Sequence, residues 1–325
     1  MRAVESTAEP DLESARRRAP AVDWPRPVGR RLRPLVPYAL LAPSLAVIGA
    51  ILAWPLYQLV LISFQQYGLK ELFQHKGRFV GLANYRSVLG DPFFWSVVVR
   101  TVVFATTCVA LTMVAGTLVA LLLRRVGRRM RLLVTAGLVF AWAMPPLTAV
   151  AIWQWMFDFE FGVVNWVLTE AHAGHFINHN WFDQPLQGFA VIVLVVVWGA
   201  IPFVAITLHA GLTQVPAELT EAALVDGANP WQLFRRVTFP LLKPVFLILT
   251  TLSTIWDFRV FTQVWVMLNQ RPGRDFFLLN IYAYSESFGV SRYGLGATIA
   301  IASVVLLMIL TAFYVRQMLH TVEVA

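Results

Sequence analysis

The sequence contains little charge and almost no cysteine. Asp, Glu, Lys and Arg make up 14% of its 325 residues, whereas ordinary soluble domains carry roughly 25%. Hydrophobic residues account for 58%, a composition typical of an integral membrane protein. Cys108 is the single cysteine, which excludes an intrachain disulfide and a cysteine-rich metal site.

The signatures of nucleotide-hydrolysing and other enzymes are missing as well. The sequence has no G-x-x-x-x-G-K-[ST] phosphate loop, no nucleophile motif and no zinc-protease motif. We therefore expect no catalysis, no cofactor and no bound metal. The net charge is +8, but the basic residues form short clusters between apolar runs. That distribution argues against nucleic-acid binding.

Six apolar runs are each near the roughly 20 residues that a helix needs to cross the hydrocarbon. They cover residues 37–64, 97–123, 132–157, 187–212, 245–269 and 294–316. The predicted fold class is all-α, a polytopic membrane bundle of about six transmembrane helices. Pro145 and Pro146 should kink or interrupt the third helix near mid-membrane.

The basic residues predict the orientation in the plasma membrane. Residues 1–34 are rich in arginine, proline and small polar residues, so we expect a disordered cytoplasmic tail ahead of a single transmembrane domain, 35–325. With the N-terminus inside, the cytoplasmic segments hold 17 lysines and arginines and the external segments hold 7. The positive-inside rule then places both termini in the cytoplasm.

The segment between the fourth and fifth apolar runs, residues 213–244, has the features of two short helices joined by a turn. Pro216 favours the start of a helix, and Gly227 can take the left-handed conformation that ends it. Small residues lie between them, which leaves one side of this helix free of bulk. We expect the 213–244 loop to lie along the membrane surface and to dock into a cleft of a soluble partner.

The second short helix has its own start and stop signals. Asn229 is a favoured capping residue, Pro230 follows at the first helical position, and Gln232 has the spacing of a capping box. Pro240 is expected to stop this helix just before the membrane. The 213–244 loop is therefore predicted to be a helix-turn-helix.

This pattern resembles the signature of permeases from binding-protein-dependent ATP-binding-cassette (ABC) importers, which combines Glu-Ala-Ala, a following glycine, an apolar residue and a proline. The matching residues are Glu221, Ala222, Ala223, Asp226, Gly227 and Pro240. The resemblance implies that the 213–244 loop is a cytoplasmic coupling helix seated in a groove of an ATPase subunit. It also implies that Glu221 pairs with an arginine of that subunit.

The resemblance extends over roughly residues 35 to 320 and is closest to MalF-type subunits of oligosaccharide importers. Residues 165–168, 180–182 and 256–265 look most like actinobacterial chitobiose or cellobiose permeases. The implied function is a permease subunit that translocates a di- or oligosaccharide delivered by an extracellular binding lipoprotein. The implied partners are ATPase subunits, a second homologous permease and membrane lipid, with ATP hydrolysis on a separate chain.

Two alternatives remain open from the sequence. The first is a permease of the same family for another solute, such as a polyamine or phosphate. The second is a membrane-embedded enzyme that uses Asp257 or the histidines His172, His175 and His179. Their spacing of three and four residues is compatible with metal ligation on a helix, but Gly174 and Asn178 favour a solvated loop.

Candidates for the substrate path lie in and near the predicted fifth span. Asp257 and Arg259 fall inside it, where an unpaired charge costs at least ~2.5 kcal/mol, so each should face the bundle interior or a wet cavity. Two residues apart, they differ by about 200° around a helix, whereas Arg259 and Gln263, four apart, share a face. We expect Arg259 and Gln263 to line the path, Trp198 and Trp256 to offer aromatic walls, and Asp257 to pair with a neighbouring helix.

Overall fold

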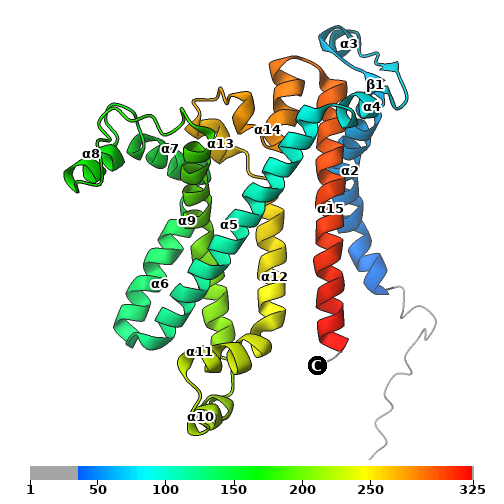
Figure 1. Cartoon of the computed structure of the whole chain (residues 1–325). Helices are drawn as coiled ribbons and strands as arrows, with labels where there is room; N and C mark the ends of the chain where they lie inside the picture. Colours follow the sequence, from blue (N-terminus) through cyan, green and yellow to red (C-terminus); the bar gives the residue numbers. More distant parts are fainter. Residues whose placement is uncertain (1–35, 324–325) are drawn as a thin grey trace, which may run out of the picture. The chain divides into compact units, whose positions relative to one another are not determined.

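The computed structural model describes residues 36–323 (Figure 1). The tail predicted at residues 1–34 lies outside them. The chain divides into two compact units, Met1–Leu56 and Tyr57–Ala325. In the first unit, the described residues form the beginning of α2 (Val36–Ser63), a helix without charged residues.

The second unit contains the other long helices, α5 (Pro92–Arg125), α9 (Pro185–Leu212), α12 (Phe239–Phe258) and α15 (Tyr293–Glu323). With α2, five helices of the described part are long and apolar enough to cross a membrane, counting the helical stretch that leads into α12 as part of it. The bent pair α6 (Arg128–Ala143) and α7 (Pro146–Met156) would make a sixth. The predicted all-α membrane bundle is confirmed.

The break in the third span falls at the two prolines that predicted it. The axes of α6 and α7 differ by 98°, and Met144 and Pro145 separate the two helices. Neither proline has an N–H to donate to the preceding turn, so the helix cannot continue straight through Pro145 and Pro146. Beyond α7 follows the short helix α8 (Val163–Glu170).

The predicted fifth span, 245–269, is wrong beyond Phe258. The helix α12 ends at Phe258, and a separate short helix, α13 (Thr262–Met267), follows after a break. At the end of α12 the amide of Asn280 donates to the carbonyl oxygen of Phe258 at 3.4 Å. A residue 22 positions along the chain therefore satisfies a carbonyl that a continuing helix would have used.

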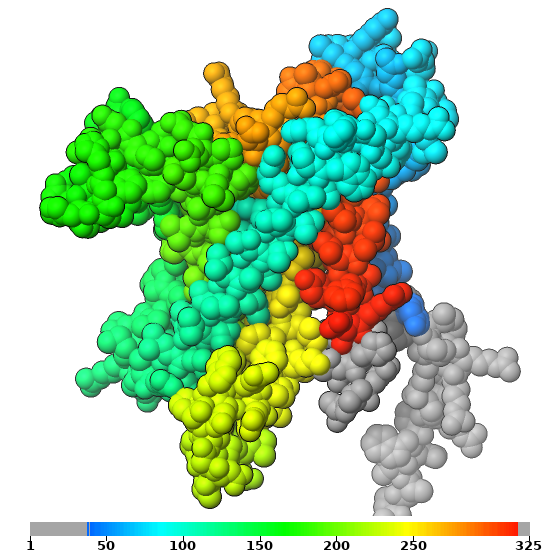
Figure 2. Space-filling model, viewed as in Figure 1, coloured from blue at the N-terminus to red at the C-terminus, as the bar shows by residue number. Residues whose placement is uncertain are grey.

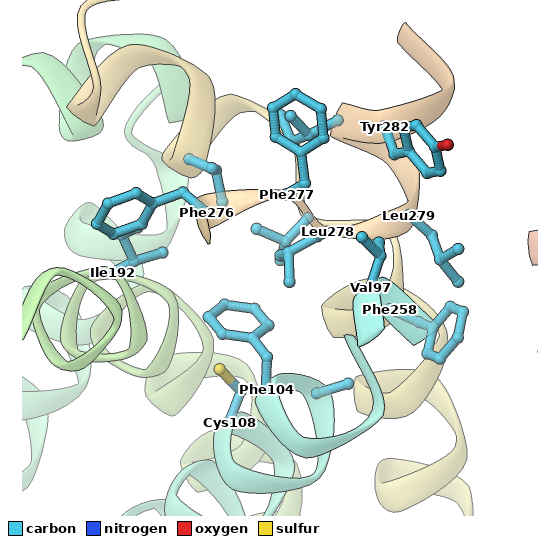
Figure 3. Packing of buried hydrophobic residues seen from close by; sticks show 14 of the residues in the cluster. Val97, Phe104, Cys108, Ile192, Phe258, Phe276, Phe277, Leu278, Leu279 and Tyr282 are labelled. Carbon is cyan, nitrogen blue, oxygen red and sulfur yellow. The ribbon is translucent and has the colours of Figure 1, made fainter. Parts of the chain in front are cut away.

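The main core lies where α5, α9 and the end of α12 meet the segment after α13 (Figure 3). That segment contains η2 (Arg274–Phe276), α14 (Leu279–Tyr284) and η3 (Ser285–Gly289). The sequence predicted an external connection here, yet Leu278 and Leu279 are fully buried. The Thr101 hydroxyl accepts a hydrogen bond from the backbone N–H of Leu279 at 3.0 Å, which fixes the segment against α5.

Two further groups of short elements lie at opposite ends of the second unit (Figure 1). One end carries β1 (Gln65–Gln66), α3 (Leu69–Gln74), β2 (Arg78–Phe79) and α4 (Ala83–Leu89). The other end carries α10 (Ala217–Val225), α11 (Pro230–Leu233) and the π-helical turn η1 (Phe234–Thr238). In Figure 2 the 213–244 loop projects from one end of the bundle.

Candidate functional site

The first short helix of the 213–244 loop begins and ends where the sequence predicts. Pro216 is the capping residue before α10, and Gly227 follows its last turn with φ of +78°. The N–H of Ala228 donates to the carbonyl oxygen of Ala223 at 3.0 Å, which closes the end of the helix. No atom lies within 4 Å of a Cβ placed on Gly227. Glycine is therefore favoured at this position by backbone conformation rather than by space.

The second short helix has the predicted capping box. Asn229 Oδ1 accepts from the N–H of Gln232 at 2.9 Å, and Gln232 Oε1 accepts from the N–H of Asn229 at 2.9 Å. Pro230 occupies the first helical turn, where no N–H is needed. Hydrogen bonds between neighbouring residues thus fix the direction in which the chain leaves the turn.

The predicted stop at Pro240 is wrong. The chain stays helical from Pro230 to Phe258, and the turn before the proline widens into η1, where the N–H of Phe239 bonds to the carbonyl oxygen of Phe234. A π-helical turn of this kind relieves the clash between a proline ring and the preceding turn. The helix α12 therefore continues directly from α11 and η1 without a break.

The surface of the 213–244 loop exposes both a charge and apolar side chains. Glu221 is exposed and makes no side-chain hydrogen bond or ion pair within residues 36–323. Val225 is 88% exposed and Trp231 is 66% exposed. Exposed apolar groups beside an unpartnered carboxylate are typical of a surface that another protein covers.

A second candidate site is a cavity of about 230 Å³ formed where two helices are broken. Its walls come from the α6–α7 corner, the middle of α9 and the break between α12 and α13. Trp198 and Gly199 of α9 line it, as do Trp256 and Gln263. The amide of Gln154 in α7 donates to Asn269 Oδ1 at 2.7 Å, which holds the α7 side of the site to the end of α13.

Aromatic rings form two groups at the cavity. Phe203 of α9 lies between Trp142 and Trp256, with ring centroids 6.2 Å and 5.1 Å away respectively. Trp198 packs edge-on against Trp153 at 5.7 Å. Trp198 and Trp256 are predicted from the sequence, whereas Phe203 is not, because no local signal distinguishes it from the other apolar residues of its span.

The polar residues at the break differ from their predicted arrangement. Arg259 is exposed at the end of α12 and does not line the cavity, whereas Gln263 lies in α13 and does. Their predicted common helix face is wrong because no single helix carries both. Asp257 also lines the cavity, is only 4% exposed, and its Oδ2 has no hydrogen-bond partner in the described chain. The predicted pairing of Asp257 with a neighbouring helix is therefore not found.

The histidines of the loop after α8 do not form a cluster. The helix ends at Glu170, so His172, His175 and His179 follow it in irregular backbone, as Gly174 predicted. Among residues 36–323 no group of three His, Cys, Asp or Glu side chains is arranged to hold a metal ion. His179 instead packs edge-on against Trp181, with centroids 4.9 Å apart.

Known proteins resemble this chain over most of its length. Residues 112–321 match the family described as "Binding-protein-dependent transport system inner membrane component". The diacetylchitobiose uptake system permease protein of Streptomyces coelicolor is 43% identical over 89% of this chain and 88% of its own length. The trehalose/maltose transport system permease protein of Thermococcus litoralis is 32% identical over 86% of this chain and 92% of its own.

The fold has a relative among solved structures too. One chain in the crystal structure of a bacterial ABC transporter involved in import of the acidic polysaccharide alginate matches with a TM-score of 0.75 and 19% identity, over 89% of this chain and 96% of that one. At this identity the likeness concerns the fold alone. The family match covers the 213–244 loop, the cavity wall in α12 and α13, and α15. The chain therefore belongs to the inner membrane components of binding-protein-dependent transport systems, as a multi-pass permease.

Proposed function

We propose that this chain is the permease subunit of an ABC importer that takes up a di- or oligosaccharide delivered by a binding protein. The observation that carries the proposal is the 213–244 loop, which presents an unpartnered glutamate and exposed apolar side chains at one end of a transport-family bundle. The sugar substrate is supported by the names of two relatives, which concern diacetylchitobiose and trehalose or maltose.

The loop of residues 213–244 acts as the coupling element to a separate ATPase subunit. Glu221 accepts hydrogen bonds from a cationic side chain of that subunit, and Val225 and Trp231 fill its apolar groove. Residues Ala222 and Ala223 keep the docking side narrow, while Asp226 and Gly227 end the helix. Because the helix runs unbroken from Pro230 to Phe258, closure of the ATPases pulls directly on α12.

The cavity at the helix breaks is the part of the substrate path that this chain supplies. Sugar rings stack on aromatic faces, and their hydroxyl groups need a small number of fixed donors and acceptors. Trp256 and Trp198 provide the aromatic faces, and Asp257 and Gln263 provide the hydrogen-bonding groups. A second, homologous permease completes the path opposite this wall, and alternating access opens it first to the outside and then to the cytoplasm.

The orientation follows from the same assignment. The 213–244 loop lies in the cytoplasm, both termini of the chain lie there as well, and residues 1–34 form a tail before the permease domain of 35–325. Cysteine labelling in a Cys108-free background measures this directly. A membrane-impermeant maleimide should label position 175 in intact cells and position 229 only after permeabilisation. External labelling at position 229 would reverse the orientation.

Reconstitution tests the function itself. The full complex, with two permeases, ATPase subunits and binding protein, is placed in proteoliposomes and supplied with radiolabelled disaccharide and internal ATP. Uptake that needs both ATP and the binding protein is the expected result. If the complex transports phosphate or a polyamine instead, the chain is still a permease, but the assignment of a sugar as its substrate is wrong.

A further inference from the structure

The hairpin of residues 64–82, at the end of the bundle opposite the 213–244 loop, is held rigidly. Its strands β1 and β2 pair antiparallel, with Gln65 opposite Phe79. The amide of Asn84 donates to the carbonyl oxygens of Ser63 and Gln65 at 2.9 and 2.8 Å. These bonds join the two ends of the hairpin. The N–H of Gly294 in α15 also donates to the carbonyl oxygen of Tyr67 at 3.1 Å, which fixes the hairpin to the bundle.

The helix at the tip of the hairpin is capped at both ends. Glu71 Oε2 accepts from the N–H of Gly68 at 2.9 Å, and His75 ends α3 in the left-handed conformation with φ of 53°. The backbone N–H groups of Glu71 and Gly68 hold the pKa of the Glu71 carboxyl below its ordinary value. The one acidic residue of the hairpin is thus already hydrogen-bonded to the chain itself.

Large apolar side chains are nevertheless left in solvent on this rigid tip. Phe73 is 77% exposed and Phe79 is 74% exposed, with Leu69 and Leu72 exposed as well. Folding of the hairpin does not account for these aromatic rings, because strand pairing uses backbone groups and the capping and anchoring bonds use other side chains. Rigid, exposed aromatic side chains are characteristic of protein interaction surfaces, where they bind with little loss of entropy.

The fully exposed charges of the hairpin are all positive. Lys70, Lys76 and Arg78 are exposed, and only Arg78 has a side-chain hydrogen bond, to Gln66. With Glu71 bonded to its own backbone, the tip offers free positive charge around its apolar groups. A complementary surface would carry acidic residues around an apolar patch.

The position of the hairpin selects a protein rather than lipid as this partner. In Figure 1, α3 lies past the end of α15, on the side of the bundle away from α10. Since α15 is one of the spanning helices, the tip extends beyond the level of the hydrocarbon. We propose that the 64–82 hairpin is a docking surface for an acidic, apolar patch of the solute-loaded binding protein, an inference that depends on the proposed function.

The test measures binding-protein affinity for the complete transporter in lipid nanodiscs by biolayer interferometry, together with ATP hydrolysis. The double variant Phe73→Ser/Phe79→Ser should weaken the affinity about 30-fold, the effect of losing an aromatic anchor. Lys70→Glu/Lys76→Glu should weaken it about tenfold and make the remaining binding less sensitive to salt. Basal ATP hydrolysis should stay unchanged in both, because the coupling loop is untouched.

Phe161→Ser is the matched control, because Phe161 is 73% exposed in a different outer loop. Its affinity should stay within about twofold of the wild type. Unchanged affinity in both hairpin variants would overturn the docking surface. Quenching by brominated phosphatidylcholine of the fluorescence that Phe73→Trp adds to the wild-type signal would also overturn it and place the tip in the bilayer. Absence of any binding-protein stimulation in the wild-type complex is a different result, and it would contradict the proposed function instead.

Discussion

The 213–244 loop and the break between α12 and α13 lie at the two ends of the same helical stretch and are built in different ways. The loop is exposed, and hydrogen bonds between residues at most five positions apart fix its two turns. At the break, Asp257 and Val260 are buried, and Asn280 and the α6–α7 corner, both distant in sequence, form the surroundings. A local structure of the first kind can be docked and released as a unit, whereas the second changes shape only when the surrounding helices move.

The largest loss of sugar uptake is expected at Glu221, and comparing uptake with membrane yield distinguishes docking of the loop from its folding. Glu221→Lys should reduce sugar uptake at least about 100-fold, because the variant places a cation where a partner's cation is expected. Glu218→Lys, also exposed in α10, is the matched control and should retain most activity. Uptake and membrane yield are measured in proteoliposomes and by detergent extraction. Equal loss in both variants would mean that position 221 has no special role.

The turn at Gly227 should show the next largest effect. A valine must adopt φ near +78°, which costs a β-branched residue roughly 2 kcal/mol, so Gly227→Val should lower stimulated ATP hydrolysis about 30-fold. Asparagine tolerates this conformation, and Gly227→Asn should keep at least about half of the activity. If valine is tolerated as well as asparagine, the loop does not transmit force through this turn.

Variants of Asp257 and Gln263 test whether the cavity binds the sugar. Asp257→Asn keeps the shape but removes the charge, and it should raise the sugar concentration for half-maximal uptake about tenfold, since a hydrogen bond to a charged group contributes roughly 1.5–3 kcal/mol. Gln263→Ala should raise it about fivefold. Complex yield should not change in either. Normal uptake with a reduced yield of Asp257→Asn would instead support the helix-pairing role predicted from the sequence.

The smallest effect is expected at Arg259. Its side chain is exposed and lies outside the cavity lining, so Arg259→Gln should leave uptake within about twofold of the wild type. Gln263→Ala, measured beside it, provides the contrast. A loss at Arg259 as large as that at Gln263 would restore the single helical face that the sequence predicted for these two residues.

The difference between these regions explains which parts could be predicted. Capping by Asn229 and the left-handed turn at Gly227 depend on neighbouring residues, so sequence reasoning found them. The continuation through Pro240 was missed because a proline signals a helix end on average, and a single π-helical turn removes the conflict. The end of α12 at Phe258 was missed because neither glycine nor proline marks it.

By itself, the sequence determined that this chain is a membrane helical bundle and that the 213–244 loop contains two short helices joined by a turn, with the Glu-Ala-Ala signature. Length, apolar composition and local hydrogen bonds decide these features. The tertiary structure alone decided that Asp257 faces a cavity, that Arg259 does not, and that the segment around Leu278 and Leu279 belongs to the core. These outcomes depend on packing between segments far apart in the chain, where the neighbours of a residue, rather than its own preferences, decide whether a helix continues.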